Sequence, residues 1–112
     1  MLKNLFQSKE DRIKQQVEEH IAEGMKLLSE KFYNGAMIEF DKAMILAPED
    51  VYPRLVSELE TAASSGELQS ALAIGLNLIK ENNKDYKLAN KLGNYARELK
   101  DINKQMDYIK RH

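Results

Sequence analysis

The fold is decided by residues 24–48, GMKLLSEKFYNGAMIEFDKAMILAP. Apolar residues recur every three or four positions on both sides of the segment Tyr33-Asn34-Gly35, which is the spacing of two amphipathic helices. Asn34 and Gly35 readily leave the right-handed helical region, so we expect the chain to turn there. Pro48 disfavours helical geometry in the residue before it and should end the second helix. The stretch therefore predicts a helical hairpin. Its apolar positions are Leu27, Leu28 and Phe32, then Ala36, Phe40, Ala43 and Met44.

Apolar residues at helical spacing continue on both sides of this hairpin. Ser8 is a typical helix N-cap, and a stripe that includes Ile13 and Val17 leads into the hairpin, so we expect the first helix at about residues 9–31. The second helix is expected at about 35–47. The same criterion predicts four more helices, at about 55–63, 68–79, 86–99 and 102–109.

The pattern also repeats along the chain. Gly66 and Ala71 stand 35 residues after Lys31 and Ala36. Gly93 stands 69 residues after Gly24, which adds a second interval of similar length. Such periodicity predicts repeated units within one domain. The expected parts are an N-terminal arm, 1–8, and a domain, 9–112, with units at about 17–50, 52–85 and 86–112.

Residues in the first unit resemble a known family. They are Gly24, Tyr33, Ala36-x-x-x-Phe40-x-x-Ala43 and Pro48, and they look like the tetratricopeptide repeat (TPR), a helix-turn-helix unit of about 34 residues. The resemblance covers about residues 17–50. It implies an all-α fold, a right-handed α-solenoid of three antiparallel helix hairpins. It also implies that the protein holds other proteins, with a peptide groove formed by the first helix of each hairpin.

The register of the resemblance assigns ten positions to this groove. They are Ile21, Met25, Leu28, Val56, Glu60, Lys87, Asn90, Lys91, Asn94 and Arg97. The groove would be apolar at one end and cationic at the other, with Asn amides that both donate to and accept from a peptide backbone. The implied partner is a protein or peptide segment with apolar residues at one end and acidic residues at the other. Two alternatives stay open for the apolar end: its residues form ordinary core, or they are covered by Leu2, Leu5 and Phe6.

Composition indicates an ordinary soluble helical protein. Hydrophobic residues make up 43% of the 112 residues and charged residues 31%. Cysteine is absent, so neither a disulfide nor a thiolate metal site is available. No run approaches the roughly 18 apolar residues of a membrane span. The N-terminal residues lack the apolar centre of a signal peptide. We therefore expect a cytoplasmic protein.

The sequence offers little for catalysis or for a cofactor. His20-x-x-Glu23 places an imidazole and a carboxylate on one helix face, but carboxylate-bridged metal sites need a second such pair, and the other histidine is His112. There is no glycine-rich phosphate loop and no Ser/His/Asp arrangement. The basic residues between Lys84 and Lys104 are opposed by an acidic remainder, which disfavours nucleic acid. We expect no enzymatic activity, no metal and no cofactor.

Charge is distributed unevenly along the chain. Residues 8–67 hold 13 acidic and 7 basic side chains, whereas residues 84–112 hold 4 acidic and 8 basic ones. Such asymmetry suggests an interaction surface. The main hypothesis is a non-catalytic adaptor or scaffold. The alternatives are self-association, in which the acidic first unit of one copy meets the basic third unit of another, and a docking domain of a larger protein.

Overall fold

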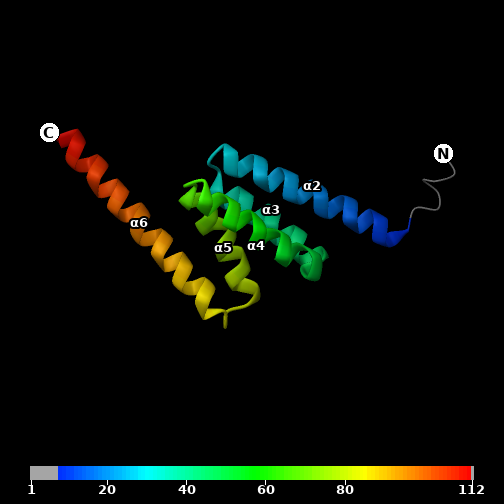
Figure 1. The fold of residues 1–112 in the computed structure, drawn as a ribbon. Coiled ribbons are helices and arrows are strands. Elements are labelled where there is room, and N and C mark those ends of the chain that lie inside the picture. Colours follow the sequence, from blue (N-terminus) through cyan, green and yellow to red (C-terminus); the bar gives the residue numbers. More distant parts are fainter. Residues whose placement is uncertain (1–7, 112) are drawn as a thin grey trace. The chain divides into compact units, whose positions relative to one another are not determined.

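A computed structural model describes residues 8–111 of the chain, with side chains up to Lys104. This part is all-helical and contains no strand, which confirms the predicted all-α class. The helices are α2 (Lys9–Ser29), α3 (Tyr33–Leu46), α4 (Pro48–Ser64), α5 (Leu68–Glu81) and α6 (Tyr86–Arg111) (Figure 1). Two compact units divide the chain between Arg54 and Leu55, within α4. The predicted arm contacts of Leu2, Leu5 and Phe6 lie outside the described residues.

The start of α2 is capped as the sequence predicts. The backbone N–H of Asp11 donates to Oγ of Ser8 at 3.1 Å, and the backbone of Ser8 is extended. Glu10 and Asp11 then occupy the first turn, where carboxylates interact favourably with the positive end of the helix dipole. These features fix where α2 begins.

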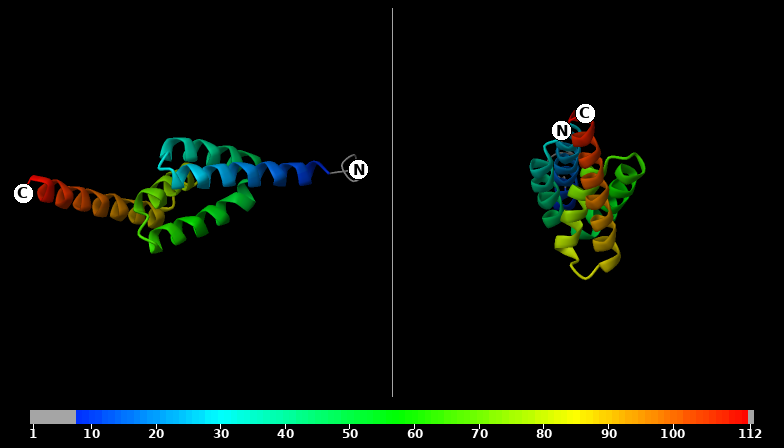
Figure 2. Two further views of the ribbon diagram at one scale, coloured as in Figure 1. Left: turned by 90° about the horizontal axis from the view of Figure 1, so that it is seen from above. Right: turned by 90° about the vertical axis from the view of Figure 1, so that its left-hand side faces the viewer.

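The core of the first unit lies between α2 and α3, which pack side by side (Figures 1 and 2). The ring of Phe40 is fully buried against Gly24. A Cβ atom at Gly24 would lie 2.8 Å from Cδ1 and 2.9 Å from Cζ of that ring, so only glycine permits this approach. The buried residues of these two helices are Val17, Ile21, Gly24, Leu28, Ala36, Phe40, Ala43 and Met44.

A cluster of three titratable side chains also links α2 to α3. His20 Nδ1 lies 2.7 Å from Glu39 Oε2, and Lys42 Nζ donates to Glu39 Oε1 at 3.2 Å. The hydrogen bond with His20 lowers the pKa of Glu39, partial burial opposes this effect, and Lys42 adds to the lowering. The imidazole of His20 therefore meets a carboxylate across the hairpin, on the partner helix.

We expect Glu39→Gln to reduce stability near neutral pH and to have little effect in acid. The folded-state pKa of Glu39 is below its unfolded value of about 4.3, so its stabilisation is fully present above that pH and is lost as the pH falls through the folded value. Urea unfolding of both proteins, followed by circular dichroism from about pH 7 to about pH 3, measures the difference. A stability difference that is as large at about pH 3 as at about pH 7 would contradict this assignment.

The turn between α2 and α3 is formed by other residues than we expected. Lys31 carries the positive φ angle, +67°, and the N–H of Phe32 donates to the carbonyl of Leu27 at 2.8 Å. This is the hydrogen-bond pattern of a Schellman motif, which closes a helix through backbone groups alone. The predicted break at Tyr33-Asn34-Gly35 is wrong, because these residues begin α3. The turn, closed by backbone hydrogen bonds at Lys31, therefore lies two residues before the predicted break.

The turn between α4 and α5 repeats this geometry 35 residues later. Gly66 has φ +79°, and the N–H of Glu67 donates to the carbonyl of Ala62 at 2.9 Å. Helices α3 and α5 both contain 14 residues, and each ends in the same way, with Ala47 donating to Ala43 and Asn82 to Leu78. The two turns are therefore separated by the same 35 residues as Ala36 and Ala71 are in the sequence.

The third helix starts earlier than predicted. We expected it after Pro53, but α4 begins at Pro48 and continues through Pro53. Proline is well suited to the first position of a helix, where its N–H would have no partner. Pro53 lies further inside and cannot donate to the carbonyl of Glu49, so α4 lacks one hydrogen bond just before the boundary between the units.

The third predicted hairpin is also corrected. Residues 86–111 form the single helix α6, where we expected one helix at 86–99 and another at 102–109. Lys100 and Asp101 lie between those segments, and neither residue breaks a helix in the way that Gly or Pro does. Asp85 caps the start of α6, since its Oδ1 accepts from the N–H of Leu88 at 3.0 Å. The side chains predicted at Met106 and Ile109 lie outside the described ones.

Helices α5 and α6 form the packed pair of the second unit. Gly75 faces Leu92, and a Cβ atom at Gly75 would lie 3.1 Å from Cγ and Cδ1 of Leu92 and closer still to Cδ2. Leu88 and Leu92 are both buried, whereas side chains further along α6 become more exposed. The contact between α5 and α6 is therefore centred on the first half of α6.

Candidate functional site: a groove on the first unit

A groove lies between the first half of α2 and the start of α4. Its volume is about 540 Å³, and all its lining residues belong to the first unit. They are Glu10, Ile13, Lys14, Val17, Glu18, Ile21, Ala47, Asp50, Val51 and Arg54. We call this the α2–α4 groove.

The floor of the groove is apolar. Ile13, Val17 and Ile21 follow one another at spacings of four residues along α2, so they share one face of that helix. Val51 lies opposite them on α4 and is fully buried, as Ile21 nearly is. Ile13 is only half-buried and therefore offers apolar surface to a ligand.

The corner between α3 and α4 places the second wall. Ala47 leaves helical geometry with φ −152°, and Pro48 starts α4 immediately afterwards. The N–H groups of Asp50 and Val51 both donate to the carbonyl of Ala47, at 3.2 and 2.9 Å. These bonds hold the first turn of α4 against the end of α3, and Val51 and Arg54 line the groove from that turn and the next.

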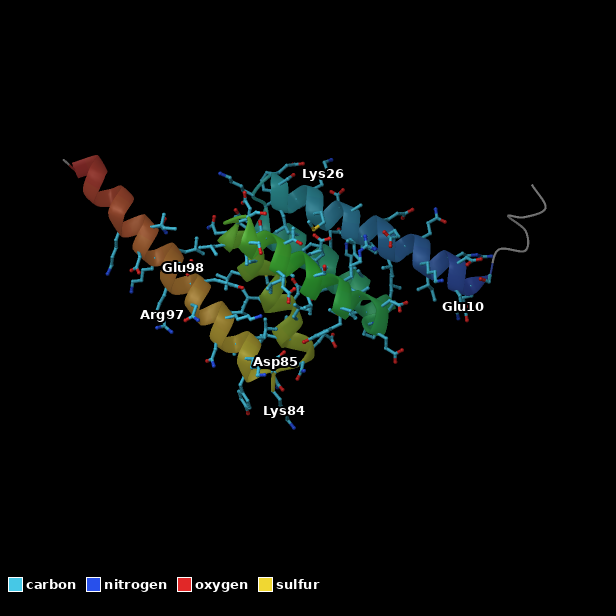
Figure 3. The ribbon with its side chains drawn as sticks, in the orientation of Figure 1. Glu10, Lys26, Lys84, Asp85, Arg97 and Glu98 are labelled. Atoms are coloured by element: carbon cyan, nitrogen blue, oxygen red, sulfur yellow. The ribbon has the colours of Figure 1, made fainter. Side chains whose placement is uncertain are left out.

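The rim carries both signs of charge. Arg54 NH1 donates to Glu18 Oε1, which joins α4 to α2 across the groove. This hydrogen bond lowers the pKa of Glu18, with a further contribution from the charge of Arg54. Both side chains are largely exposed, so solvent screens the pair and it orients the rim more than it stabilises the fold. Figure 3 shows Glu10 at the beginning of α2, at the end of the groove nearest the N-terminus.

This arrangement suits binding through shape and apolar contact. The floor excludes water from several aliphatic groups, and the charged rim stays in contact with solvent. Among the described residues, no three His, Asp or Glu side chains lie together in a way that would hold a metal ion.

The structure places the predicted groove residues in different environments. Ile21 lines the α2–α4 groove, as does the neighbouring Glu18. Leu28 is buried in the hairpin core, and Met25 is half-buried; neither lines the groove. Leu28 is near the end of α2, where the chain turns back into α3, so α3 covers it.

The other predicted positions belong to the second unit. Val56 is half-buried and Glu60 exposed on α4. The five positions on α6 are all exposed and share one side of that helix: Lys87, Asn90, Lys91, Asn94 and Arg97. That these residues join Ile21 in one continuous groove stays a prediction.

Sequence reasoning missed the α4 side of the groove. Val51 and Arg54 lie between the helices that we expected at about 35–47 and 55–63, because Pro48 was interpreted only as the end of the preceding helix. Pro48 followed by the acids Glu49 and Asp50 is equally the signature of a helix start. That signal would have placed Val51 and Arg54 on a helix.

Two further observations bear on the class of protein. None of the helices within residues 8–111 has the length and apolar character needed to cross a membrane. Comparison of the chain with protein-family models, with curated proteins and with solved structures found no match.

Proposed function

We propose that this protein is a non-catalytic protein–protein interaction module that holds an apolar segment of a partner in the α2–α4 groove. The observation that supports the proposal is the groove itself, with an aliphatic floor and a rim of both charges. Its volume of about 540 Å³ falls within the range of roughly 300–1,000 Å³ that is usual for ligand pockets. The two similar turns at Lys31 and Gly66, 35 residues apart, support a scaffold built from repeated helical units.

The length of the apolar floor limits the length of the segment that can bind. Ile13 and Ile21 are eight residues apart on α2, which corresponds to about 12 Å along the helix. A span of this length receives two or three apolar side chains, such as those on one face of a two-turn helix. Rim charges of both signs then select the orientation of the segment. The preferred ligand is therefore a short amphipathic segment.

The exposed stripe of α6 supplies a second element of the proposal. Lys87, Lys91 and Arg97 would attract acidic residues of the partner, while Asn90 and Asn94 hydrogen-bond its backbone. A cytoplasmic, reducing location suits a chain that contains no cysteine.

A displayed library of random peptides tests this function. Peptides selected on the wild-type protein should bind Ile13→Glu about tenfold more weakly or worse, because the new carboxylate lies on an apolar floor. Ile38→Glu is the matched control: Ile38 is an exposed isoleucine of α3 that does not line the groove. Calorimetric titration with the synthesised peptides gives the affinities.

The outcomes separate the parts of the proposal. Peptides that bind Ile13→Glu as tightly as wild type, or a library that yields no peptide, would show the groove assignment to be wrong. Selected peptides with acidic ends should also lose affinity for the double variant Lys91→Glu/Arg97→Glu. If Ile13→Glu weakens binding and the double variant Lys91→Glu/Arg97→Glu does not, the exposed stripe of α6 has no part in binding.

A further inference from the structure

Helix α6 carries a second apolar surface, distinct from the α2–α4 groove. Its apolar residues alternate at spacings of four and three, which is the a/d pattern of a coiled coil. They are Leu88, Leu92, Tyr95, Leu99 and Ile102, and in the sequence the spacing continues with Met106 and Ile109. We call this row the α6 seam. It spans three heptads of one unbroken helix.

Helix α5 covers only the beginning of the seam. The two helices are joined by a short turn and run in opposite directions (Figures 1 and 2), with Gly75 against Leu92. Because α5 has 14 residues, it reaches along α6 no further than about Leu99. Exposure follows this limit: Leu92 is buried, Leu99 is half-buried, and Ile102 is 46% exposed.

Among the described side chains of the seam, Ile102 is the one that α5 leaves most exposed. Helix α6 contains 26 residues against 14 in α5, so about 18 Å of it extends past α5 (Figure 1). Figure 3 shows Arg97 and Glu98 near the point where this extension begins. An apolar row on an exposed helix face gains free energy from any matching surface.

We propose that the free part of the α6 seam pairs with the same seam of a second copy of this chain. A strict period of 3.5 residues packs best against a helix with the same period, since both must supercoil together. Within the described helices, α6 carries this pattern, whereas the stripe of α2 advances by four residues twice in succession, from Ile13 to Val17 to Ile21. A second α6 is the partner that the chain itself provides.

The residues beside the seam favour such pairing. The edge positions beside the free part of the seam are Ala96, Glu98, Asn103, Gln105 and Lys110, and one acidic and one basic residue among neutral ones produce little like-charge repulsion between two copies. The free seam covers roughly two heptads, so the buried area is small and the dimer is weak and concentration-dependent. This self-association is independent of the proposed peptide binding.

Sedimentation equilibrium of the full chain over a wide concentration range tests the pairing. The wild type should pass from monomer to dimer, and Ile102→Gln should raise the dissociation constant about tenfold or more, because each dimer loses two buried isoleucines. Lys104→Gln is the control, since Lys104 lies on the far side of α6 and is exposed. Helicity by circular dichroism should be equal in all three proteins.

A disulfide test reports the contact directly. The chain has no cysteine, so Ile102→Cys introduces a single thiol that should form a covalent dimer on mild oxidation if the two seams pair in parallel register. Ile102→Cys mixed with Met106→Cys should form the heterodimer preferentially if they pair antiparallel. Lys104→Cys should crosslink in neither case. A chain that remains monomeric at millimolar concentration, or a dimer that Ile102→Gln leaves unchanged, would overturn the proposal.

Discussion

Phe40→Ala should lower the free energy of unfolding of the first unit by about 3–5 kcal/mol. The Phe40 ring is fully buried, and Gly24 of α2 contacts it directly. Because Gly24 has no side chain, nothing on that side of the ring can move into the space that the substitution creates. The loss therefore includes both the transfer energy of the ring and the cost of a cavity. Urea unfolding followed by circular dichroism measures it.

The matched control for this variant is Ile38→Ala. Ile38 is two residues earlier in α3 and 56% exposed, so its truncation should change stability by no more than about 0.5 kcal/mol. Amide hydrogen exchange locates the effect, because Phe40→Ala should speed exchange in α2 and α3. Similar small losses for both variants would mean that the Phe40–Gly24 contact does not hold the hairpin together.

Gly75→Val should destabilise the second unit by about 2–3 kcal/mol. The space that a Cβ atom needs at Gly75 is occupied by the side chain of Leu92, which is itself buried. Valine would force α5 and α6 apart or push Leu92 out of its position. Since this contact joins α6 to α5, exchange protection should fall first in α6.

Two comparisons isolate the steric cause of that loss. Gly93→Val places the same residue on α6 at a position where a Cβ atom meets nothing within 4 Å, so it should be close to neutral. Adding Leu92→Ala to Gly75→Val should cost less than Leu92→Ala costs alone, because the first substitution has already displaced that leucine. If the stability losses of Gly75→Val and Leu92→Ala are additive, the clash with Leu92 is not the cause of the loss in Gly75→Val.

The hairpin of residues 24–48 was predictable because its signals are local. The spacing of apolar residues predicts both helices, Ser8 predicts the start of α2, and Pro48 predicts the end of α3, as the structure has them. The turn residue was not predictable in this way. A lysine in the left-handed region is uncommon, since its Cβ atom crowds the backbone there, and the Schellman hydrogen bonds of the turn offset that cost at Lys31.

The site was predictable only in part, for a different reason. Helical period places Ile21 and Glu18 on one side of α2, but the second wall depends on whether Pro48 ends one helix or starts the next, and it does both. The length of α6 was missed because apolar spacing alone does not distinguish one long helix from two short ones. Lys100 and Asp101 interrupt the apolar pattern without interrupting the backbone.

The matched turns at Lys31 and Gly66 have a consequence for how this chain tolerates inserted residues. Both are closed by backbone hydrogen bonds, and each is followed by a helix of 14 residues, although Phe40 of α3 corresponds in spacing to Gly75 of α5. One inserted residue in either helix would rotate everything after it by about 100° about the axis, which would turn the buried side chains beyond it away from their contacts. We therefore expect a single-residue insertion within α3 or α5 to be more damaging than a substitution on the exposed face of the same helix.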